Sequence, residues 1–286
     1  MSFSVGIVGL PNVGKSTLFQ ALTQKPVDIA DYPFTTIEPN VGIVRVPDER
    51  LEKIAEVIKP EKITSTIIEF IDIAGLVKNA HKGEGLGNQF LAQIRNCDAI
   101  LEVVRAFGQN PNPKEDIETI KTEFEMKDLE SQEKENLLSK KPVIYVLNTD
   151  GQTQYQPPDV EHLVLNLKEE LDISELSEEE RKELGLKSKL DQLILASYNI
   201  LDLITFYTIK GGKETRAWTL KRGETCPQAG GIVHSDFQEK FIKAEVINWQ
   251  KLVEAGSWSK AREKGWLQTA GKEYIIQEGD VLEFKI

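Results

Sequence analysis

Residues 9–17 read Gly9-Leu10-Pro11-Asn12-Val13-Gly14-Lys15-Ser16-Thr17, and the organisation of the whole chain is interpreted from this stretch. The apolar residues 3–8 before it predict a buried strand, and residues 18–22 after it indicate the beginning of a helix. A strand, the pattern G-x-x-x-x-G-K-S and a helix in this order are typical of a phosphate-binding P-loop. The sequence therefore predicts an α/β fold, a doubly wound and mostly parallel sheet with the P-loop near its beginning.

The residue types in this loop match the chemistry of binding a polyphosphate. Gly9 and Gly14 allow the tight turn in which the backbone N–H groups of residues 12–16 surround a β-phosphate. Lys15 supplies a positive charge to the β- and γ-phosphates, and the Ser16 hydroxyl is placed to ligate Mg²⁺. The following helix directs the positive end of its dipole at the same phosphates.

The composition is that of a globular protein with room for two domains. The chain has 286 residues, of which 40% are hydrophobic and 28% charged, and this excludes a disordered chain. It contains no apolar run of about 18 residues and no basic segment at its start, so we expect neither a membrane span nor a signal peptide. Cys97 and Cys226 are the only cysteines, and their separation excludes a zinc-binding spacing and favours a reducing cytoplasm.

The charge of the chain is uneven. The net charge is −11, which argues against a protein that binds nucleic acid over its whole surface. Residues 204–286 contain 13 Lys and Arg and 11 Asp and Glu, so this part carries +2 and residues 1–203 carry −13. Although +2 is close to neutral, the asymmetry indicates that any RNA contact is made by the C-terminal part.

Two segments downstream of the P-loop carry the residue types of nucleotide switches. Thr36 lies in a loop with two prolines, residues 31–39, where its hydroxyl could ligate Mg²⁺ and its N–H could reach the γ-phosphate. The apolar residues 66–75 end in D-x-x-G, which places Asp72 to hold a Mg²⁺-bound water and the Gly75 N–H to face the γ-phosphate. We therefore predict a catalytic set of Lys15, Thr36 and Gly75 and a metal-binding set of Ser16, Thr36 and Asp72.

The residue after Gly75 removes one known route to hydrolysis. In Ras-like switches a Gln at this position orients the attacking water, whereas this chain has Leu76, whose side chain cannot do so. Asn12 is one alternative, acting through a monovalent cation such as K⁺, and its other interpretation is a loop cap. His81 could act as a general base, but we favour an exposed loop histidine.

A further stretch bears on the identity of the base. The apolar residues 142–147 predict another parallel strand, and Asn148-Thr149-Asp150-Gly151 follows it. GTP-binding folds place N-K-x-D here, and its Asp carboxylate accepts both N–H donors of guanine. In this chain Asn148 is present, Thr149 replaces the Lys and Gly151 replaces the Asp. Asp150 could substitute only if the loop is shifted by one residue, so the sequence favours adenine or a loose specificity.

The pattern changes near Ile204. Short strands separated by Gly-rich turns are predicted from there onward, with one helix at about residues 235–241, which indicates a small β-grasp-like domain. We therefore divide the chain into a nucleotide-binding domain of residues 1–203 and a C-terminal domain of residues 204–286. Basic residues and a Trp near the first predicted hairpin could contact RNA, or could form a solvated hairpin with a core Trp. They are Lys213, Arg216, Trp218, Lys221 and Arg222.

Several of these motifs together resemble the YchF-type ATPases of the Obg-related translation-factor class. The motifs are residues 6–17 (GIVGLPNVGKST), 32–40 (YPFTTIEPN), 72–77 (DIAGLV) and 82–88 (KGEGLGN). The C-terminal stretches 216–219, 231–237 and 279–281 are similar to the TGS domain of that family. The resemblance therefore covers nearly the whole chain.

The resemblance implies a Mg²⁺-dependent P-loop protein that prefers ATP over GTP and binds the ribosome through its large subunit. We expect a cytoplasmic monomer that contacts RNA through its TGS domain. The resemblance also implies that the phosphates are held by Asn12, Val13, Gly14, Lys15, Ser16 and Thr17, that Mg²⁺ is held by Ser16 and Thr36, and that the base lies beside Asn148 and Thr149.

The chain departs from the family pattern in three places. The family inserts a long antiparallel coiled coil after the strand that ends near Ala106, whereas here the connection has room only for a helical stub at about residues 112–139. Residues 107–111 lack the His that the family carries there as a proposed catalytic residue. Gly151 also replaces the Glu of the family's base motif N-x-x-E, so adenine selectivity by analogy is weakened.

Three hypotheses follow for the function. The first is an ATPase switch in which nucleotide and Mg²⁺ order Thr36 and Gly75 and alter docking on the ribosome. The second is a GTPase of the Obg type. The third is a non-catalytic module that binds the ribosome or RNA and uses nucleotide only for structure.

Overall fold

The computed structural model describes residues 3–24, 27, 40–73, 86–131, 136–210 and 212–286. Contacts within the chain divide it into two compact units. The N-terminal unit comprises Ser2–Val44 and Ile67–Leu201, and the C-terminal unit comprises Arg45–Thr66 and Asp202–Ile286. The sequence-based division at residue 203 therefore misses one feature, because the segment 45–66 belongs to the C-terminal unit.

The N-terminal unit is built on a six-stranded sheet in the order β2-β4-β1-β5-β6-β7. Its strands are β1 (Ser4–Val8), β2 (Val41–Arg45), β4 (Ile67–Asp72), β5 (Ala99–Ala106), β6 (Val143–Thr149) and β7 (His162–Leu165). Strand β1 pairs in parallel with β4 and β5, and the parallel pairing continues from β5 through β6 to β7. This confirms the predicted α/β fold, in which apolar strands are buried on both faces.

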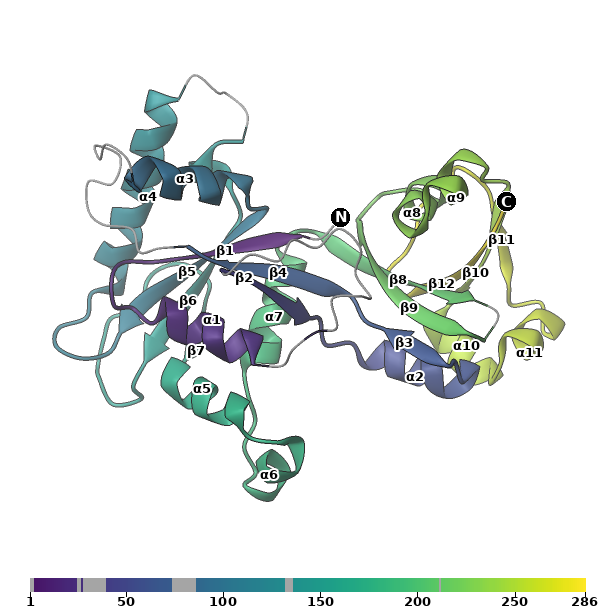
Figure 1. Cartoon of the computed structure of the whole chain (residues 1–286), viewed down its shortest axis with the longest axis horizontal. Coiled ribbons are helices and arrows are strands. Elements are labelled where there is room, and N and C mark those ends of the chain that lie inside the picture. Colours follow the sequence, from purple (N-terminus) through teal and green to yellow (C-terminus); the bar gives the residue numbers. More distant parts are fainter. Residues whose placement is uncertain (1–2, 25–26, 28–39, 74–85, 132–135, 211) are drawn as a thin grey trace. The chain divides into compact units, whose positions relative to one another are not determined.

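Helices cover both faces of this sheet (Figure 1). On one face, α3 (Leu86–Asn96) and α4 (Pro113–Glu130) place Ile94, Ile120 and Phe124 in a core cluster with Val8 and Ile100. On the other face, α1 (Lys15–Thr23) and α5 (Leu167–Glu175) pack together. The remaining helical elements described in this unit are α6 (Glu178–Glu183), α7 (Leu190–Asn199) and the 3₁₀ turn η3 (Leu138–Lys140).

The described part of the connection between β5 and β6, which is predicted to be a helical stub, contains the packed helix α4 and the short turn η3. Helix α4 begins at Pro113, with Asn112 as its N-cap, and runs for 18 residues between β5 and β6. Ile117, Ile120 and Phe124 are buried against the sheet. In the described part of this connection, the predicted helical stub is therefore a covering layer of the sheet.

The C-terminal unit is built on a second six-stranded sheet in the order β11-β10-β12-β8-β9-β3. Its strands are β3 (Lys62–Thr64), β8 (Leu203–Lys210), β9 (Glu214–Lys221), β10 (Lys243–Asn248), β11 (Gln268–Ala270) and β12 (Asp280–Lys285). Its helices are α2 (Glu49–Ile58), α8 (Cys226–Val233), α9 (Ser235–Glu239), α10 (Trp249–Ala255) and α11 (Trp258–Glu263). Helices α8 and α9 lie on one face, and α2, α10 and α11 lie on the other (Figure 1).

The segment 45–66 supplies part of this second unit. Strand β3 joins the sheet by parallel pairing with β9, and the Val46 N–H donates to the Thr66 carbonyl at 3.0 Å where the segment begins and ends. On α2, Leu51 and Ile54 are buried in one cluster with Tyr207 of β8. The segment is thus a hydrophobic layer of the C-terminal sheet, although it lies between β2 and β4 in the sequence.

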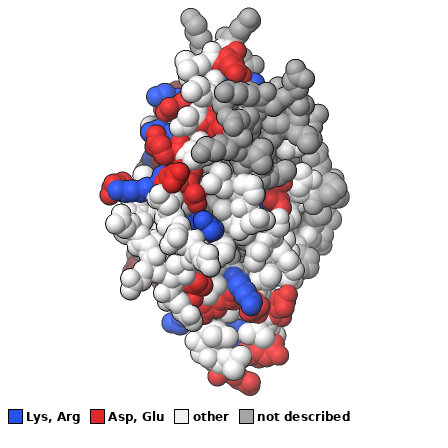
Figure 2. All heavy atoms as spheres, turned by 90° about the vertical axis from the view of Figure 1, so that its left-hand side faces the viewer, with Lys and Arg blue, Asp and Glu red and all other residues white. Residues whose placement is uncertain are grey.

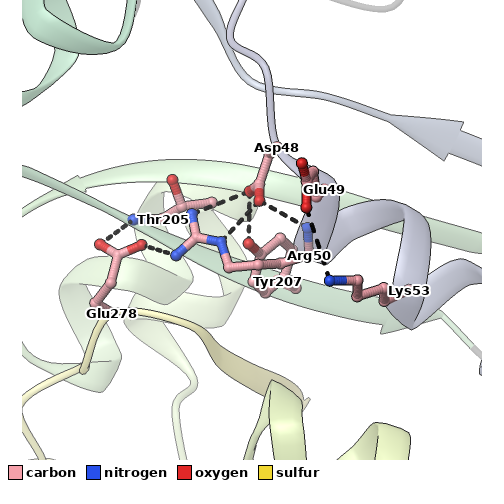
Figure 3. Close-up of polar contacts among 7 residues, drawn as sticks. All are labelled: Asp48, Glu49, Arg50, Lys53, Thr205, Tyr207 and Glu278. Atoms are coloured by element: carbon pink, nitrogen blue, oxygen red, sulfur yellow. Dashed lines mark hydrogen bonds and ion pairs between the residues drawn. The ribbon is translucent and has the colours of Figure 1, made fainter. Parts of the chain in front are cut away.

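A polar network fixes the beginning of α2 to the C-terminal sheet (Figure 3). Asp48 caps the helix by accepting from the Arg50 N–H at 3.1 Å and also accepts from the Arg50 Nε at 2.7 Å. The guanidinium of Arg50 also contacts Glu278, whose other carboxylate oxygen accepts from the Thr205 N–H at 3.1 Å. Tyr207 completes the network through its hydroxyl.

The C-terminal unit contains more helix than the sequence analysis predicted. Only α9 matches the predicted helix at residues 235–241, and α8, α10 and α11 were not predicted. Local signals for all three exist. Thr225 and Gln228 form a capping box at the beginning of α8, Asn248 caps α10 and Gly256 ends it with a φ of 78°, and Ser257 then caps α11. Residues 274–276 form none of the named strands and contribute only an isolated bridge between Ile275 and Thr225.

Candidate functional site

The P-loop connects the end of β1 to the beginning of α1 in the middle of the N-terminal sheet. Gly9 has a φ of 152°, and a Cβ atom there would lie 2.4 Å from the Val103 carbonyl oxygen. Gly14 has a φ of 107°, and its Cβ atom would lie 2.6 Å from the Asn148 Nδ2. Both positions therefore require glycine, because the loop passes too close to β5 and β6 for any side chain. Since β1 lies between β4 and β5, the loop is at the place in an open α/β sheet where ligands bind.

Lys15 is the first residue of α1, and its side chain folds back over the loop. Its Nζ donates to the carbonyl oxygens of Gly9 at 3.1 Å and Leu10 at 2.9 Å. The residue is 8% exposed, and burial lowers the pKa of Lys15 while the negative charge of Asp72 opposes this shift. The loop therefore holds a largely buried cation whose partners are two neutral carbonyls, and an anionic phosphate is a stronger partner for it.

Ser16 and Asp72 come together at the carboxyl ends of two adjacent strands. Ser16 follows Lys15, Asp72 ends β4, and the Ser16 Oγ donates to the Asp72 Oδ2 at 3.1 Å. One hydroxyl and one carboxylate are the oxygen ligands with which Mg²⁺ is held in nucleotide sites, together with phosphate oxygens and water. The pair therefore fits the predicted metal.

Asn148 connects the P-loop to the end of β6. Its Nδ2 donates to the Val13 carbonyl at 2.9 Å, and its Oδ1 accepts from the Leu167 N–H at 3.1 Å. The side chain is buried and both ends of its amide are used, so it braces the phosphate loop against the beginning of α5. The sequence predicts that Asn148 lies beside the base. It does not reveal this brace, because Val13, Asn148 and Leu167 are far apart in the sequence and meet only in the folded protein.

The other predicted site residues fall into two groups. Asn12 is exposed in the P-loop with a φ of 61°, and Thr17 is half-buried in the first turn of α1. Thr36 and Gly75 lie outside the described residues, as do Leu76 and His81. Of the predicted catalytic and metal-binding residues, the structure thus brings together Lys15, Ser16 and Asp72.

The predicted RNA-contacting residues are spread along β9. The Arg216 guanidinium lies 4.2 Å from the centre of the Trp218 ring, and the Trp218 Nε1 donates to the Thr208 Oγ1 at 2.8 Å. Lys221 is at the other end of the strand, about 16 Å from Arg216 at about 3.3 Å per residue, and Arg222 pairs with Asp202 at 2.9 Å. The predicted cluster therefore divides into a stacked pair near the hairpin and a separate basic end.

No helix among the described residues is both long and apolar enough to cross a membrane.

Two family models match the chain. A model of "50S ribosome-binding GTPase" matches residues 4–149, and a model named for the C-terminal part of YchF GTPases, described as "Protein of unknown function (DUF933)", matches residues 203–286. Together they cover the P-loop, the sheet of the N-terminal unit through β6 and the C-terminal sheet.

Whole-length relatives agree with these matches. The chain is 40% identical to the "Ribosome-binding ATPase YchF" of Bacillus subtilis over 364 aligned residues, which cover 100% of this chain and 99% of the relative. It is 38% identical to the protein of that name from Escherichia coli O157:H7, with 99% of both chains covered. The alignment to the Bacillus protein is longer than this chain of 286 residues, so that relative contains residues without a counterpart here.

A solved structure shows the same fold over the same range. The structure of the Schizosaccharomyces pombe YchF GTPase superposes with a TM-score of 0.85 at 30% identity and covers 99% of this chain and 98% of that one. Sequence and structure agree over the full length, and the chain therefore belongs to the YchF family of P-loop nucleotide hydrolases.

Proposed function

We propose that the protein is a Mg²⁺-dependent nucleoside triphosphatase that uses ATP and acts as a molecular switch on the ribosome. The observation that carries the proposal is the P-loop arrangement, in which the buried Lys15 ammonium and the Ser16–Asp72 pair meet at the end of β1. The names of the relatives from Bacillus subtilis and Escherichia coli, both ribosome-binding ATPases, support the choice of nucleotide and partner.

Each residue of the loop has a separate task in this reaction. Lys15 exchanges its two carbonyl partners for β- and γ-phosphate oxygens, and the N–H groups of residues 12–16 hold the β-phosphate. Ser16 and Asp72 hold Mg²⁺, which when bound neutralises charge on the phosphate oxygens. Thr36 and Gly75 contact the γ-phosphate and lose this contact after hydrolysis, which changes docking on the ribosome. Turnover without a partner is slow, since Leu76 replaces the water-orienting Gln.

A GTPase is the second candidate, and two comparisons favour it. The N-terminal family model is described as a GTPase, and the Schizosaccharomyces pombe structure is titled a GTPase. The missing family His and the shortened connection between β5 and β6 motivate the third candidate, a non-catalytic ribosome-binding module. In either catalytic case a K⁺ ion beside Asn12 is the proposed substitute for the absent Gln.

We propose that the protein works as a cytoplasmic monomer. Its C-terminal unit contacts ribosomal RNA of the large subunit. The face of the protein in Figure 2 carries acidic and basic side chains intermixed, and its described atoms form no continuous basic patch. In the C-terminal unit, by contrast, Arg216 and Trp218 offer a cation stacked on an aromatic ring, with exposed Lys213 nearby in the sequence. Such a pair suits a phosphate and an unstacked base.

Calorimetric titration tests the P-loop assignment. The Lys15→Ala variant should bind MgATP at least a hundredfold more weakly than the parent, and the control Lys187→Ala, at an exposed position, should bind normally. Equal affinity of Lys15→Ala and the parent would refute the assignment. Phosphate release measured with and without ribosomes and K⁺ then separates the two catalytic candidates from the non-catalytic module, because absence of turnover under every condition would leave only the module.

A further inference from the structure

Strands β2 and β4 form a two-stranded ribbon, and one end of this β2–β4 ribbon is at Asp72. The two strands are neighbours in the N-terminal sheet, and β2 is an edge strand of it. The Asp72 N–H donates to the carbonyl of Asn40 at 2.9 Å, where β4 ends and β2 is about to begin. Asp72 is therefore held by the Ser16 hydroxyl on the P-loop side and by the backbone beside β2.

Strand β2 also packs closely on the helix that follows the P-loop. A Cβ atom at Gly42 would lie 2.2 Å from the Thr23 Cγ2 and 3.0 Å from the Phe19 Cε2, and both of these side chains belong to α1. A displacement of β2 therefore changes the packing of α1 as well as the hold on Asp72. Because β2 has five residues and is paired on one side only, its place depends on what holds its two ends.

The segment 45–66 closes the other end of the ribbon. The Val46 N–H donates to the Thr66 carbonyl at 3.0 Å. Two residues, Val46 and Pro47, separate β2 from Asp48, the N-cap of α2. Two others, Ser65 and Thr66, separate β3 from β4. These junctions contain no glycine, and the ring of Pro47 fixes one backbone angle, so the chain has little slack where it leaves the ribbon and returns to it.

The segment 45–66 needs the C-terminal sheet for its own structure. Leu51 and Ile54 are buried against Tyr207, and the Thr64 Oγ1 donates to the Glu214 carboxylate at 3.0 Å beside the pairing of β3 with β9. A helix of 10 residues and a strand of 3 residues are marginal on their own in water. If the C-terminal sheet unfolds, the segment loses the partner of its apolar face, and the ribbon is open at this end.

From these contacts we propose that the C-terminal unit positions Asp72 for the Mg²⁺-bound nucleotide, through the segment 45–66 and the β2–β4 ribbon. The inference rests on the proposed function, because it concerns the metal and phosphate site of that function. Unfolding of the C-terminal unit opens the ribbon, loosens β2 and the hold on Asp72, and thereby weakens nucleotide binding. Because the coupling of two equilibria is reciprocal, nucleotide bound at the P-loop stabilises the C-terminal unit in turn.

Urea unfolding followed by Trp fluorescence measures this coupling, because all four Trp residues belong to the C-terminal unit. The full chain is unfolded without nucleotide and with Mg²⁺ and the imidodiphosphate analogue of ATP at about a hundred times its dissociation constant. If unfolding of the C-terminal unit weakens binding tenfold, which is about 1.4 kcal/mol, the analogue should raise the Trp-detected midpoint by about 0.5–1 M urea. In Lys15→Ala, which binds the analogue poorly, the rise should be much smaller.

Flexible insertions test whether the coupling passes through the segment 45–66. A Gly-Ser-Gly-Ser linker inserted after Pro47 and another after Ser65 keep every residue of both units but give the two junctions slack, and they should remove most of the rise. The same linker after Leu201, where the chain passes between the units for the third time, is the matched control and should leave the rise unchanged. Each insertion is also made singly, so that the single insertions replace the double one if it does not fold.

Two results would overturn the inference and leave the proposed function standing. One is a parent that binds the analogue in a calorimetric titration but keeps its Trp-detected midpoint. The other is a rise as large with linkers after Pro47 and Ser65 as in the parent, because the coupling would then not pass through the segment. A parent that does not bind the analogue would instead overturn the proposed function, and the inference with it.

Discussion

The hydroxyl of Tyr207 donates a hydrogen bond of 2.5 Å to the carboxylate of Asp48, although the two residues are 159 positions apart in the sequence (Figure 3). Tyr207 is fully buried in β8, and Asp48 caps α2. Burial and the negative charge of Asp48 together raise the pKa of Tyr207. The bond thus holds the segment 45–66 on the C-terminal sheet in a region with little water.

Removal of this hydroxyl should weaken the C-terminal unit. Tyr207→Phe should lower the free energy of unfolding by about 1.5–3 kcal/mol, the range for hydrogen bonds to charged groups. All four Trp residues lie between residues 218 and 266, so urea unfolding followed by Trp fluorescence reports this unit alone. Tyr155→Phe, in the N-terminal unit, should leave the Trp-detected midpoint unchanged. A midpoint for Tyr207→Phe equal to that of the parent would contradict the role of the bond.

Truncation of a single side chain in α2 should have a larger effect on the same signal. Ile54 is fully buried among C-terminal residues, and Ile54→Ala should cost about 2–5 kcal/mol of unfolding free energy because a cavity remains. Val57→Ala shortens a half-buried side chain of the same helix and should lower the free energy of unfolding much less. If Ile54→Ala spared the Trp-detected transition and affected only the N-terminal unit, α2 would not be a layer of the C-terminal sheet.

The brace between the P-loop and α5 should be needed for nucleotide affinity. Asn148→Ala leaves the Val13 carbonyl and the Leu167 N–H without their partner, which should cost about 1–3 kcal/mol of stability. It should also weaken binding of MgATP at least tenfold, because the loop that surrounds the phosphates is no longer held in place. Calorimetric titration measures this, with the exposed Asn199→Ala as the matched control. Unchanged affinity would show that the P-loop keeps its shape without Asn148.

A buried carboxyl in β5 should make the N-terminal unit less stable at higher pH. Glu102 is 3% exposed and has one unpartnered oxygen, and burial, with a contribution from Asp116, raises the pKa of Glu102 well above its ordinary value. The folded state therefore holds a proton that the unfolded chain releases near pH 4.3. The contribution of Glu102 to the free energy of unfolding is therefore fully present below that pH. It is lost as the pH rises through the raised pKa that Glu102 has in the folded state.

The Glu102→Gln variant should lose this part of the pH dependence. Helical circular dichroism during urea unfolding, measured from pH 4 to pH 9, reports both units, and the N-terminal transition is the one without a change in Trp fluorescence. Glu125→Gln, at an exposed position on α4, should keep the pH dependence of the parent. Parallel pH profiles for the parent and Glu102→Gln would mean that the Glu102 carboxyl ionises in the folded protein without cost.

The sequence alone determined the P-loop and the α/β fold, and the reason is that both depend on neighbouring residues. Glycines at two fixed positions, a Lys and a Ser are required by phosphate chemistry within one turn of chain, and buried parallel strands are apolar throughout. Leu51 and Ile54 are three residues apart, a spacing that indicates a helix with one apolar face. That periodicity does not tell which sheet the face covers, because the hydrophobic effect is not directional.

The partners of these residues were settled by contacts between distant parts of the chain. The apolar face of α2 is buried against Tyr207 and its neighbours, so the helix belongs to the C-terminal sheet. Asp150 has a side chain that could have bound a base, but its carboxylate accepts hydrogen bonds from Gln152 and Thr153. In both cases the side chain could have served several partners, and burial and hydrogen bonding in the folded protein selected one of them.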